Sequence, residues 1–491
     1  MDTQANALQS EPLGQSLDPI IAETIAQLQR FRQNLYNFFP HRADALMELI
    51  DALASNIRAR SVVELSLSPL FRREYTSVYD AIEHFFVPSQ PEKAAQERRE
   101  QEQAILRLIV PFLPPPQQRK FWLFGTDVTY LPRRFAHTLA DRTFVHQPNP
   151  IKGNKPVTIG HDYSILSFLP EKEGPQPPPW VVPLIVRRVT STETASQVGS
   201  EQIASVVTDE TLPFKDELCV QVEDSAYSGR AYLGAVAPHK NLVSIIRLPG
   251  NRVVYRQFKR PPGEKNPVGH PTWYGERFDL KDPTTWPEPD EVAETTFTTK
   301  RGKTYTVHLE AWHDMVRTGT RDIPMHKYPF TLVRARVVDA KGKPVYRRDL
   351  WLMVIGERRR ELSLLEIWEA YGQRYDLEHF FRYGKQRLLM AAYQTPEVER
   401  EENWWQIVQL AYVQLWLARS LADALPNPWE RYLPQAKAGQ ASPSTVQRDF
   451  ERIIGQIGTP AEPPKRRGNS PGRAKGVKLP ARKRQAVVKK T

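Results

Sequence analysis

The sequence predicts an α/β protein whose mixed core is interrupted by a β-rich insertion and flanked by helical regions. Three observations support this: apolar residues recur at helical spacing near both ends, short β-branched and aromatic runs follow residue 114, and hairpin patterns follow residue 257. The expected regions are 1–113 (helical), 114–256 (first part of the core), 257–350 (β-rich insertion), 351–395 (completion of the core), 396–458 (helical) and 459–491 (a basic tail).

The composition is that of an ordinary globular protein, with 40% hydrophobic and 25% charged residues among 491. No run approaches the ~18 apolar residues of a membrane helix, and the polar N-terminus lacks the apolar core of a signal peptide. The single cysteine, Cys219, excludes an internal disulfide framework. We therefore expect a cytoplasmic protein that makes no membrane contact.

The net charge of +12 is concentrated at the C-terminus, where eleven Lys or Arg and no acidic residue follow from Lys465 onward. A basic tail attracts phosphates of any sequence, which favours contact with nucleic acid. The alternative is a solvated, disordered extension. The rest of the chain is nearly neutral, so any other DNA-binding surface must be a local patch.

The N-terminal region reads as helical over 17–113, with further helices at 43–58, 76–86 and 92–110. Prolines 114–116 end this pattern, because proline cannot continue a helix. Strands are then expected at 121–130, 157–168, 180–189, 218–222 and 242–248, with a short helix near 201–207.

The insertion carries two hairpin patterns, one over 297–311 turning at Arg301-Gly302 and one over 330–346 turning near Lys341-Gly342. Beyond it, Ser363 to Met390 reads as one long helix with Ser363 as its N-cap. A hydrophobic helix over 403–425 follows, and then a short helix opened by Ser444 in a capping-box pattern.

Two aspartates stand where strands end. Asp127 closes the first core strand within an apolar segment, and Asp224 follows the fourth. α/β folds place their sites at strand ends, and Mg²⁺ prefers carboxylate oxygens. A turn or capping role is the alternative for each aspartate taken alone.

The long helix adds a third carboxylate. Tyr371, Arg374, Glu378 and Lys385 fall within about 60° of one another around a helix axis of 100° per residue. One carboxylate among a tyrosine, an arginine and a lysine is typical of a metal ligand flanked by phosphate contacts. A solvated face with ion pairs between successive turns is the alternative.

The pattern Y-x2-R-x3-E-x6-K formed by these four residues resembles the signature of bacterial insertion-sequence transposases of the DDE class, in the Y-R-E-K group related to the insertion-sequence-four enzymes. Gly125-x-Asp127-x-Thr129 and Asp224-x-x-Tyr227 resemble the two aspartate regions of that group. The resemblance spans roughly 120–390, and the four-residue helix motif is its most specific part.

The resemblance implies a ribonuclease-H-like core in which Asp127, Asp224 and Glu378 are catalytic and bind two Mg²⁺ ions, with Mn²⁺ as a possible substitute. Tyr227, Tyr371, Arg374 and Lys385 would then contact DNA, and Trp351 would stack on a flipped base. The alternative for Trp351 is a tryptophan buried in a core strand.

The implied function is cut-and-paste transposition: binding of the inverted repeats, hydrolysis at each end and joining of the 3′ ends to target DNA. The partners would be double-stranded DNA and a second copy of the chain, with end recognition by the helices of 17–113 and by 444–456. The helix over 403–425 is a candidate dimer interface, although core packing explains it equally well. No phosphate-binding glycine loop occurs, so ATP use is not implied. We expect a bacterial protein that associates with the nucleoid when bound to DNA.

Two other functions remain open. Another nuclease with a ribonuclease-H-like core would have no required place for Tyr371, Arg374 and Lys385. A domesticated, catalytically inactive DNA-binding protein would have no need of all three carboxylates.

Overall fold

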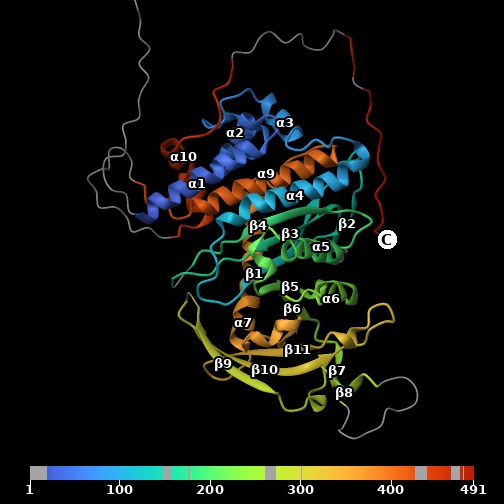
Figure 1. The fold of residues 1–491 in the computed structure, drawn as a ribbon. Helices are drawn as coiled ribbons and strands as arrows, with labels where there is room; N and C mark the ends of the chain where they lie inside the picture. Colours follow the sequence, from blue (N-terminus) through green and yellow to red (C-terminus); the bar gives the residue numbers. More distant parts are fainter. Residues whose placement is uncertain are drawn as a thin grey trace, which may run out of the picture.

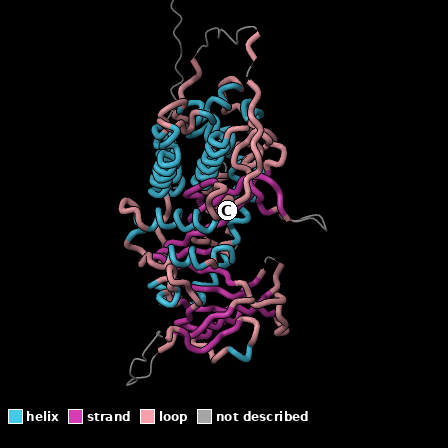
Figure 2. Tube along the Cα trace, turned by 90° about the vertical axis from the view of Figure 1, so that its right-hand side faces the viewer, coloured by secondary structure: helices cyan, strands magenta, loops and turns pink. Residues whose placement is uncertain are grey.

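The computed structural model describes residues 19–147, 156–174, 177–259, 272–299, 301–425, 440–465, 476–478 and 480–490. The molecule is elongated (Figure 1): helices gather at one end, a mixed sheet with helices occupies the middle, and strands dominate the other end. Figure 2 shows the same division from the side. None of the described helices is long and apolar enough to cross a membrane.

The described strands form one twelve-stranded sheet in the order β2-β3-β1-β5-β6-β12-β11-β10-β7-β8, with β4 beside β3 and β9 beside β10. The strands are β1 (Trp122–Pro132), β2 (Thr143–His146), β3 (Val157–Phe168), β4 (Val182–Val189), β5 (Cys219–Glu223), β6 (Leu242–Leu248), β7 (Val253–Gln257), β8 (Tyr274–Asp279), β9 (Glu291–Thr298), β10 (Thr304–Val316), β11 (Phe330–Asp339) and β12 (Leu350–Ile355).

The central part of the sheet positions the predicted aspartates. β1 pairs with β3 in antiparallel register and with β5 in parallel register, and β5 pairs in parallel with β6. The five strands expected between 121 and 248 are all present, because their buried β-branched and aromatic residues fit a sheet covered on both faces. α5 (Ala195–Val207) and α6 (Arg230–Val236) connect β4 to β5 and β5 to β6.

The helical end surrounds α9 (Val398–Leu417), which packs against β4 and α2. Every residue of α9 from Asn403 to Leu417 is buried. This burial corrects the suggestion that the hydrophobic helix forms a dimer interface: its apolar surface packs within the chain's own core. The other helices here are α1 (Pro19–Phe38), α2 (Ala43–Ala54), α3 (Thr76–Glu83), α4 (Ala94–Ile109) and α10 (Pro443–Ile457).

The β-rich end contains the first predicted hairpin as two paired strands and the second as a short turn near Lys341-Gly342. β9 and β10 pair across a turn in which Gly302 has a φ of 75°, a conformation that glycine adopts without strain. β11 pairs along its length with β10 and β12. Beyond it the chain turns at Gly342, whose φ is 74°, and the N–H of Val345 donates to the carbonyl oxygen of Val337 at 2.9 Å. Because β12 also pairs with β6, the insertion and the core share one sheet.

The predicted long helix is two helices, α7 (Leu364–Gln373) and α8 (Tyr375–Arg387), separated at Arg374. There the N–H groups of Arg374 and Leu377 donate to carbonyls three residues earlier, which tightens the backbone into a turn. Ser363 is the N-cap of α7 as predicted, in a capping box with Glu366. The N-cap of α10 is Ser442, two residues earlier than expected.

The tail is not disordered where the structure describes it. The N–H groups of Gln485 and Val488 donate to backbone carbonyls of the 133–142 segment at 2.8 Å. Arg482 pairs with Glu397 at 2.9 Å, and Lys490 pairs with Asp162 at 3.0 Å. Residues 480–490 therefore lie against the protein beside β3. The polar N-terminus (1–18) and tail residues 466–475 lie outside the described residues, as do residues 260–271 of the insertion.

Candidate active site

Asp127 and Asp224 lie side by side on neighbouring strands. Gly125 of β1 pairs with Val222 of β5, and each aspartate follows its paired residue by two positions, Asp224 directly after the end of β5. The parallel register therefore carries both carboxylates to the same level of the sheet and the same face. The sequence prediction that these two residues converge is consistent with this arrangement.

Burial governs the electrostatics of Asp127. Its side chain is 20% exposed, and burial raises the pKa of its carboxyl to about 6. The charge of Asp224 adds to this rise, while Arg374 and the N–H of Val128, which donates to Oδ1 at 2.8 Å, oppose it. The charge of ionised Asp127 is thus only partly offset by Arg374.

Asp224 caps a short turn. It is the N-cap of the 3-10 helix Ser225–Tyr227, where its Oδ1 accepts from the N–H of Ala226 at 2.7 Å. Glu223, the preceding residue, is fully buried, and neither of its carboxyl oxygens has a hydrogen-bond partner among the described residues. Burial and the charge of Asp224 hold the pKa of Glu223 well above its usual range.

Arg374 joins the helix motif to the strands. Its Nη1 lies 3.0 Å from Oδ2 of Asp127, and its Nη2 lies 3.8 Å from Oε1 of Glu378. The guanidinium is 16% exposed, whereas the Glu378 side chain is 44% exposed. The turn that separates α7 from α8 thus places a cation between the first and third predicted carboxylates.

The other two residues of the helix motif, Lys385 and Tyr371, also lie close to the core strands or to Arg374. The Lys385 ammonium donates to the carbonyl oxygen of Tyr130 at 2.9 Å and lies 4.3 Å from the centre of its ring. Burial lowers the pKa of Lys385 to about 8, against the opposing charge of Asp162. Burial raises the pKa of Tyr371, and the charges of Arg374 and Arg247 oppose that rise.

The close approach of α8 to β1 depends on Gly125. A Cβ atom at this position would lie 2.9 Å from Cδ1 of Leu377 on α8 and 3.2 Å from Cδ1 of Leu169. A Cβ atom essentially never lies that close to another atom, so a side chain at this position would require the Leu377 side chain to move. Gly125 therefore allows the Leu377 side chain of α8 to pack directly on the strand that carries Asp127.

The sequence model of a family described as DDE superfamily endonuclease matches residues 34–319. The match begins in α1, includes both aspartates and ends just after β10. The chain belongs to this superfamily. No curated protein matches the sequence. Endonucleases of this superfamily act on DNA with divalent metal ions, and membership implies that β1 to β6 and their helices form a ribonuclease-H-like core.

The carboxylates of this DDE endonuclease are suitable ligands for a hard divalent cation. A cation bound at Asp127 would offset the cost of its buried charge. Among the described residues, however, no three His, Cys, Asp or Glu side chains form a ready metal-binding group. Asp127 and Asp224 are brought together, while Glu378 is directed to Arg374.

Two residues expected to contact DNA are instead buried in the endonuclease. Tyr227 is 1% exposed, because its ring packs against Tyr232 of α6, with ring centres 5.2 Å apart, and against Gly199 of α5. Trp351 is 4% exposed on β12 within an aromatic cluster, with its ring centre 5.2 Å from that of Trp286. Trp351 is therefore a tryptophan buried in a core strand, which was the alternative to base stacking.

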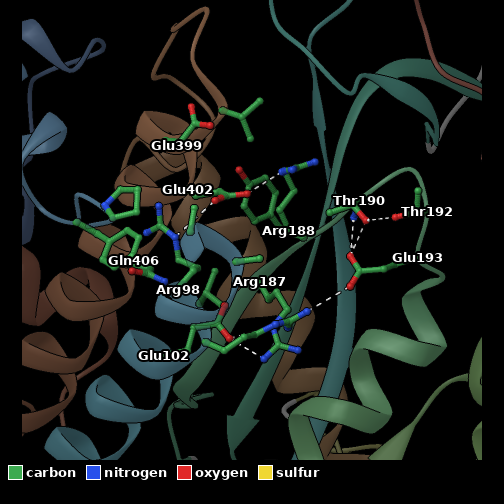
Figure 3. A pocket seen from close by; sticks show the side chains of 18 residues that line it. Arg98, Glu102, Arg187, Arg188, Thr190, Thr192, Glu193, Glu399, Glu402 and Gln406 are labelled. Atoms are coloured by element: carbon green, nitrogen blue, oxygen red, sulfur yellow. Dashed lines mark hydrogen bonds and ion pairs between the residues drawn. The ribbon is translucent and has the colours of Figure 1, made fainter. Parts of the chain in front are cut away.

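A cavity of about 460 Å³ lies away from these carboxylates, between α4, β4 and α9 (Figure 3). Its arginines are matched by glutamates: Arg187 lies 2.6 Å from Glu102, and Arg188 lies 2.8 Å from Glu402. This cavity is lined by paired charges that connect the helical end to the edge of the sheet.

Sequence reasoning missed Arg247. Ile246 of β6 pairs with Glu223 of β5, so Arg247 stands level with Asp224 on the next strand. It is exposed, and its charge acts on Tyr371. The sequence signal for this residue is an arginine within an otherwise apolar strand, β6, one residue before the strand ends.

Proposed function

We propose that this endonuclease is a cut-and-paste DNA transposase of the Y-R-E-K group, with Asp127, Asp224 and Glu378 as its metal ligands. The ion pairs of Arg374 with Asp127 and Glu378 carry the proposal, because they place the helix motif beside the first aspartate. On a solvated helix face, Arg374 would point to water and would not form an ion pair with Asp127 of β1.

Asp127, Asp224 and Glu378 would hold the proposed Mg²⁺ ions, and two such ions would supply activation of the attacking oxygen and stabilisation of the leaving oxygen. The chain's own residues would position the DNA. Arg374 can form two parallel hydrogen bonds to a phosphate once it releases Glu378, and Lys385 offers a charge at the β1–β3 side. Tyr371 would limit water access beside them.

The proposal extends to the ends of the element and to assembly. Exposed residues of α1 to α4 are the proposed surface for recognising inverted repeats, and two copies of the chain would hold the two ends together. Asp127 and Asp224 lie inside the match to the superfamily, whereas Glu378 lies beyond its last matched residue. The role of Glu378 therefore needs the most direct test.

Glu378→Gln should lower DNA cleavage by more than ~100-fold, since changing even outer residues of metal sites costs ~10–100-fold. The substrate is a supercoiled plasmid carrying the DNA that flanks this chain's own coding sequence, incubated with Mg²⁺, with Mn²⁺ or with EDTA. Nicked, linear and strand-transfer products are separated on a gel. Binding of the same DNA should be nearly unchanged.

Glu369→Gln is the matched control, because Glu369 is an exposed glutamate on the neighbouring helix α7. It should cut like the native chain. Equal cutting by Glu378→Gln would remove Glu378 from the metal site. Cleavage without strand transfer would favour another nuclease of the superfamily, and DNA binding without any cleavage would favour an inactive DNA-binding protein.

A further inference from the structure

Three arginines gather on the other side of Asp224 from Lys385. Arg230 begins α6, Arg252 lies in the turn between β6 and β7, and Arg317 follows the last residue of β10. We call these three residues the arginine cluster. It brings together one residue from each of three segments that are far apart in the sequence.

Two hydrogen bonds hold Arg317 and Arg230 beside the turn that follows β5, and the charge of Arg252 acts on Arg317. Arg317 donates to the carbonyl oxygen of Ser228 at 2.5 Å, and Arg230 donates to the hydroxyl of Thr318 at 3.1 Å. Ser228 follows Asp224 by four residues, so these bonds tie the end of β10 to the turn that begins at Asp224. The insertion therefore supplies one cation directly to the edge of the active site.

The charges of the arginine cluster have no carboxylate partner in the part of the chain that the structure describes. Within the described ranges, no carboxylate lies within 4.0 Å of Arg230, Arg252 or Arg317, whereas the arginines of the cavity in Figure 3 are paired with glutamates. Burial, together with the charges of Arg230 and Arg252, lowers the pKa of Arg317 to about 10. Mutually repelling cations held in place by specific hydrogen bonds indicate a site for an anion.

The order of the strands shows which anion fits. Across the sheet, Lys385 bonds to β1 and Asp224 directly follows β5. Arg247 stands level with Asp224 on β6, near the turn that carries Arg252. Arg230 and Arg252 are exposed, so the cluster is an open surface rather than an enclosed pocket for a small ion. Cations thus flank the carboxylates on both sides, as a continuous phosphate backbone would require.

We propose that the arginine cluster binds consecutive phosphates of the DNA strand that passes Asp224, on the side opposite Lys385. Guanidinium groups suit this role because they form paired hydrogen bonds with phosphate oxygens. The proposal rests on the proposed DNA-cutting function. It adds that the insertion, through Arg317, helps hold the DNA at the catalytic carboxylates.

The test is the salt dependence of DNA binding by the full chain. A fluorescent duplex is titrated in EDTA at several KCl concentrations, so that binding is measured without metal and without cleavage. Arg230→Gln/Arg252→Gln/Arg317→Gln should bind more weakly, and its slope of log affinity against log salt should be smaller by about 0.9 for each phosphate that the variant no longer neutralises. Arg336→Gln, which changes an exposed arginine on β11, should bind like the native chain.

The double variant Arg230→Gln/Arg252→Gln guards against misfolding, because it leaves the bond from Arg317 to Ser228 intact. This double variant should have the same melting temperature as the native chain. Its slope of log affinity against log salt should still be smaller than the native slope. A native slope in both variants would overturn the proposal while leaving the DNA-cutting function standing. If the native chain bound no DNA, both proposals would fall.

Inorganic phosphate provides a second comparison. At equal ionic strength, it should displace the duplex no better than chloride does, because the cluster is proposed to bind a backbone with several phosphates. Strong competition by phosphate that disappears in the triple variant would identify a small-anion site and overturn the proposal.

Discussion

At the scale of single residues, the site combines two charges that burial disfavours. The carboxyl of Asp127 has a pKa raised to about 6, and the ammonium of Lys385 has a pKa lowered to about 8. Both groups lie beside β1, and Arg374 provides the nearest countercharge to Asp127. A metal cation would neutralise the Asp127 carboxylate, and a DNA phosphate would neutralise the Lys385 ammonium. Binding of either ligand should therefore stabilise the folded protein.

The Lys385 pKa predicts how DNA binding depends on pH. The ammonium is charged below about pH 8 and neutral above it, so native affinity for DNA should fall between pH 7 and 9.5 at constant ionic strength. Lys385→Arg stays charged over this range and should show a flat profile. Anisotropy of a labelled duplex in EDTA measures both, and a native profile as flat as that of the variant would exclude Lys385 from DNA contact.

The same shift affects stability with a defined sign. The pKa of Lys385 is lower in the folded chain than its ordinary value of 10.5, so the folded state binds this proton less tightly than the unfolded state does. Charged Lys385 therefore destabilises the fold below about pH 8. This penalty is relieved as pH rises from about 8 towards 10.5.

At the scale of elements, the α7–α8 pair shows where sequence reasoning succeeds and where it fails. The capping box at Ser363 is a local pattern, and the sequence predicts it as the helix start. The break at Arg374 is not predictable in this way, because helical spacing continues through it and only contacts with β1 favour the turn. The burial of Tyr227 and Trp351 likewise depends on partners that are distant in sequence.

Gly125→Ala should destabilise the protein by about 1–3 kcal/mol, since the new methyl group would overlap Leu377. It should also reduce cleavage if α8 moves with the Leu377 side chain, because Glu378 is the next residue of that helix. Urea unfolding and plasmid nicking report the two effects. Leu377→Ala alone should cost about 2–5 kcal/mol, and the double variant should cost less than the sum.

Gly372→Ala is the matched control for this experiment. Nothing lies within 4 Å of a Cβ atom at Gly372, which stands in α7. Alanine favours helix over glycine, so this change should stabilise the protein by up to about 1 kcal/mol. If Gly125→Ala behaved the same way, close packing would not set the distance between β1 and α8.

At the scale of the whole molecule, the α/β core and most of its strands follow from sequence, because buried strands carry a local signal in their apolar runs. The aspartates could be placed at strand ends for the same reason. The arginine cluster could not be predicted, because it joins α6, the β6–β7 turn and the end of β10 only in the folded chain. The docked C-terminal segment is a second feature of this kind, held by Asp162 and Glu397.

The continuous sheet has a consequence for attempts to shorten the protein. Replacing 249–349 with a short turn would keep β6 paired with β12 but remove β11, the other neighbour of β12. The backbone groups of an apolar strand, Leu350–Ile355, would then face water as an open edge. Such edges recruit strands from other molecules. The shortened chain should therefore aggregate, which light scattering would detect. A shortened chain that stayed monomeric would show that β12 does not need β11 beside it to prevent aggregation.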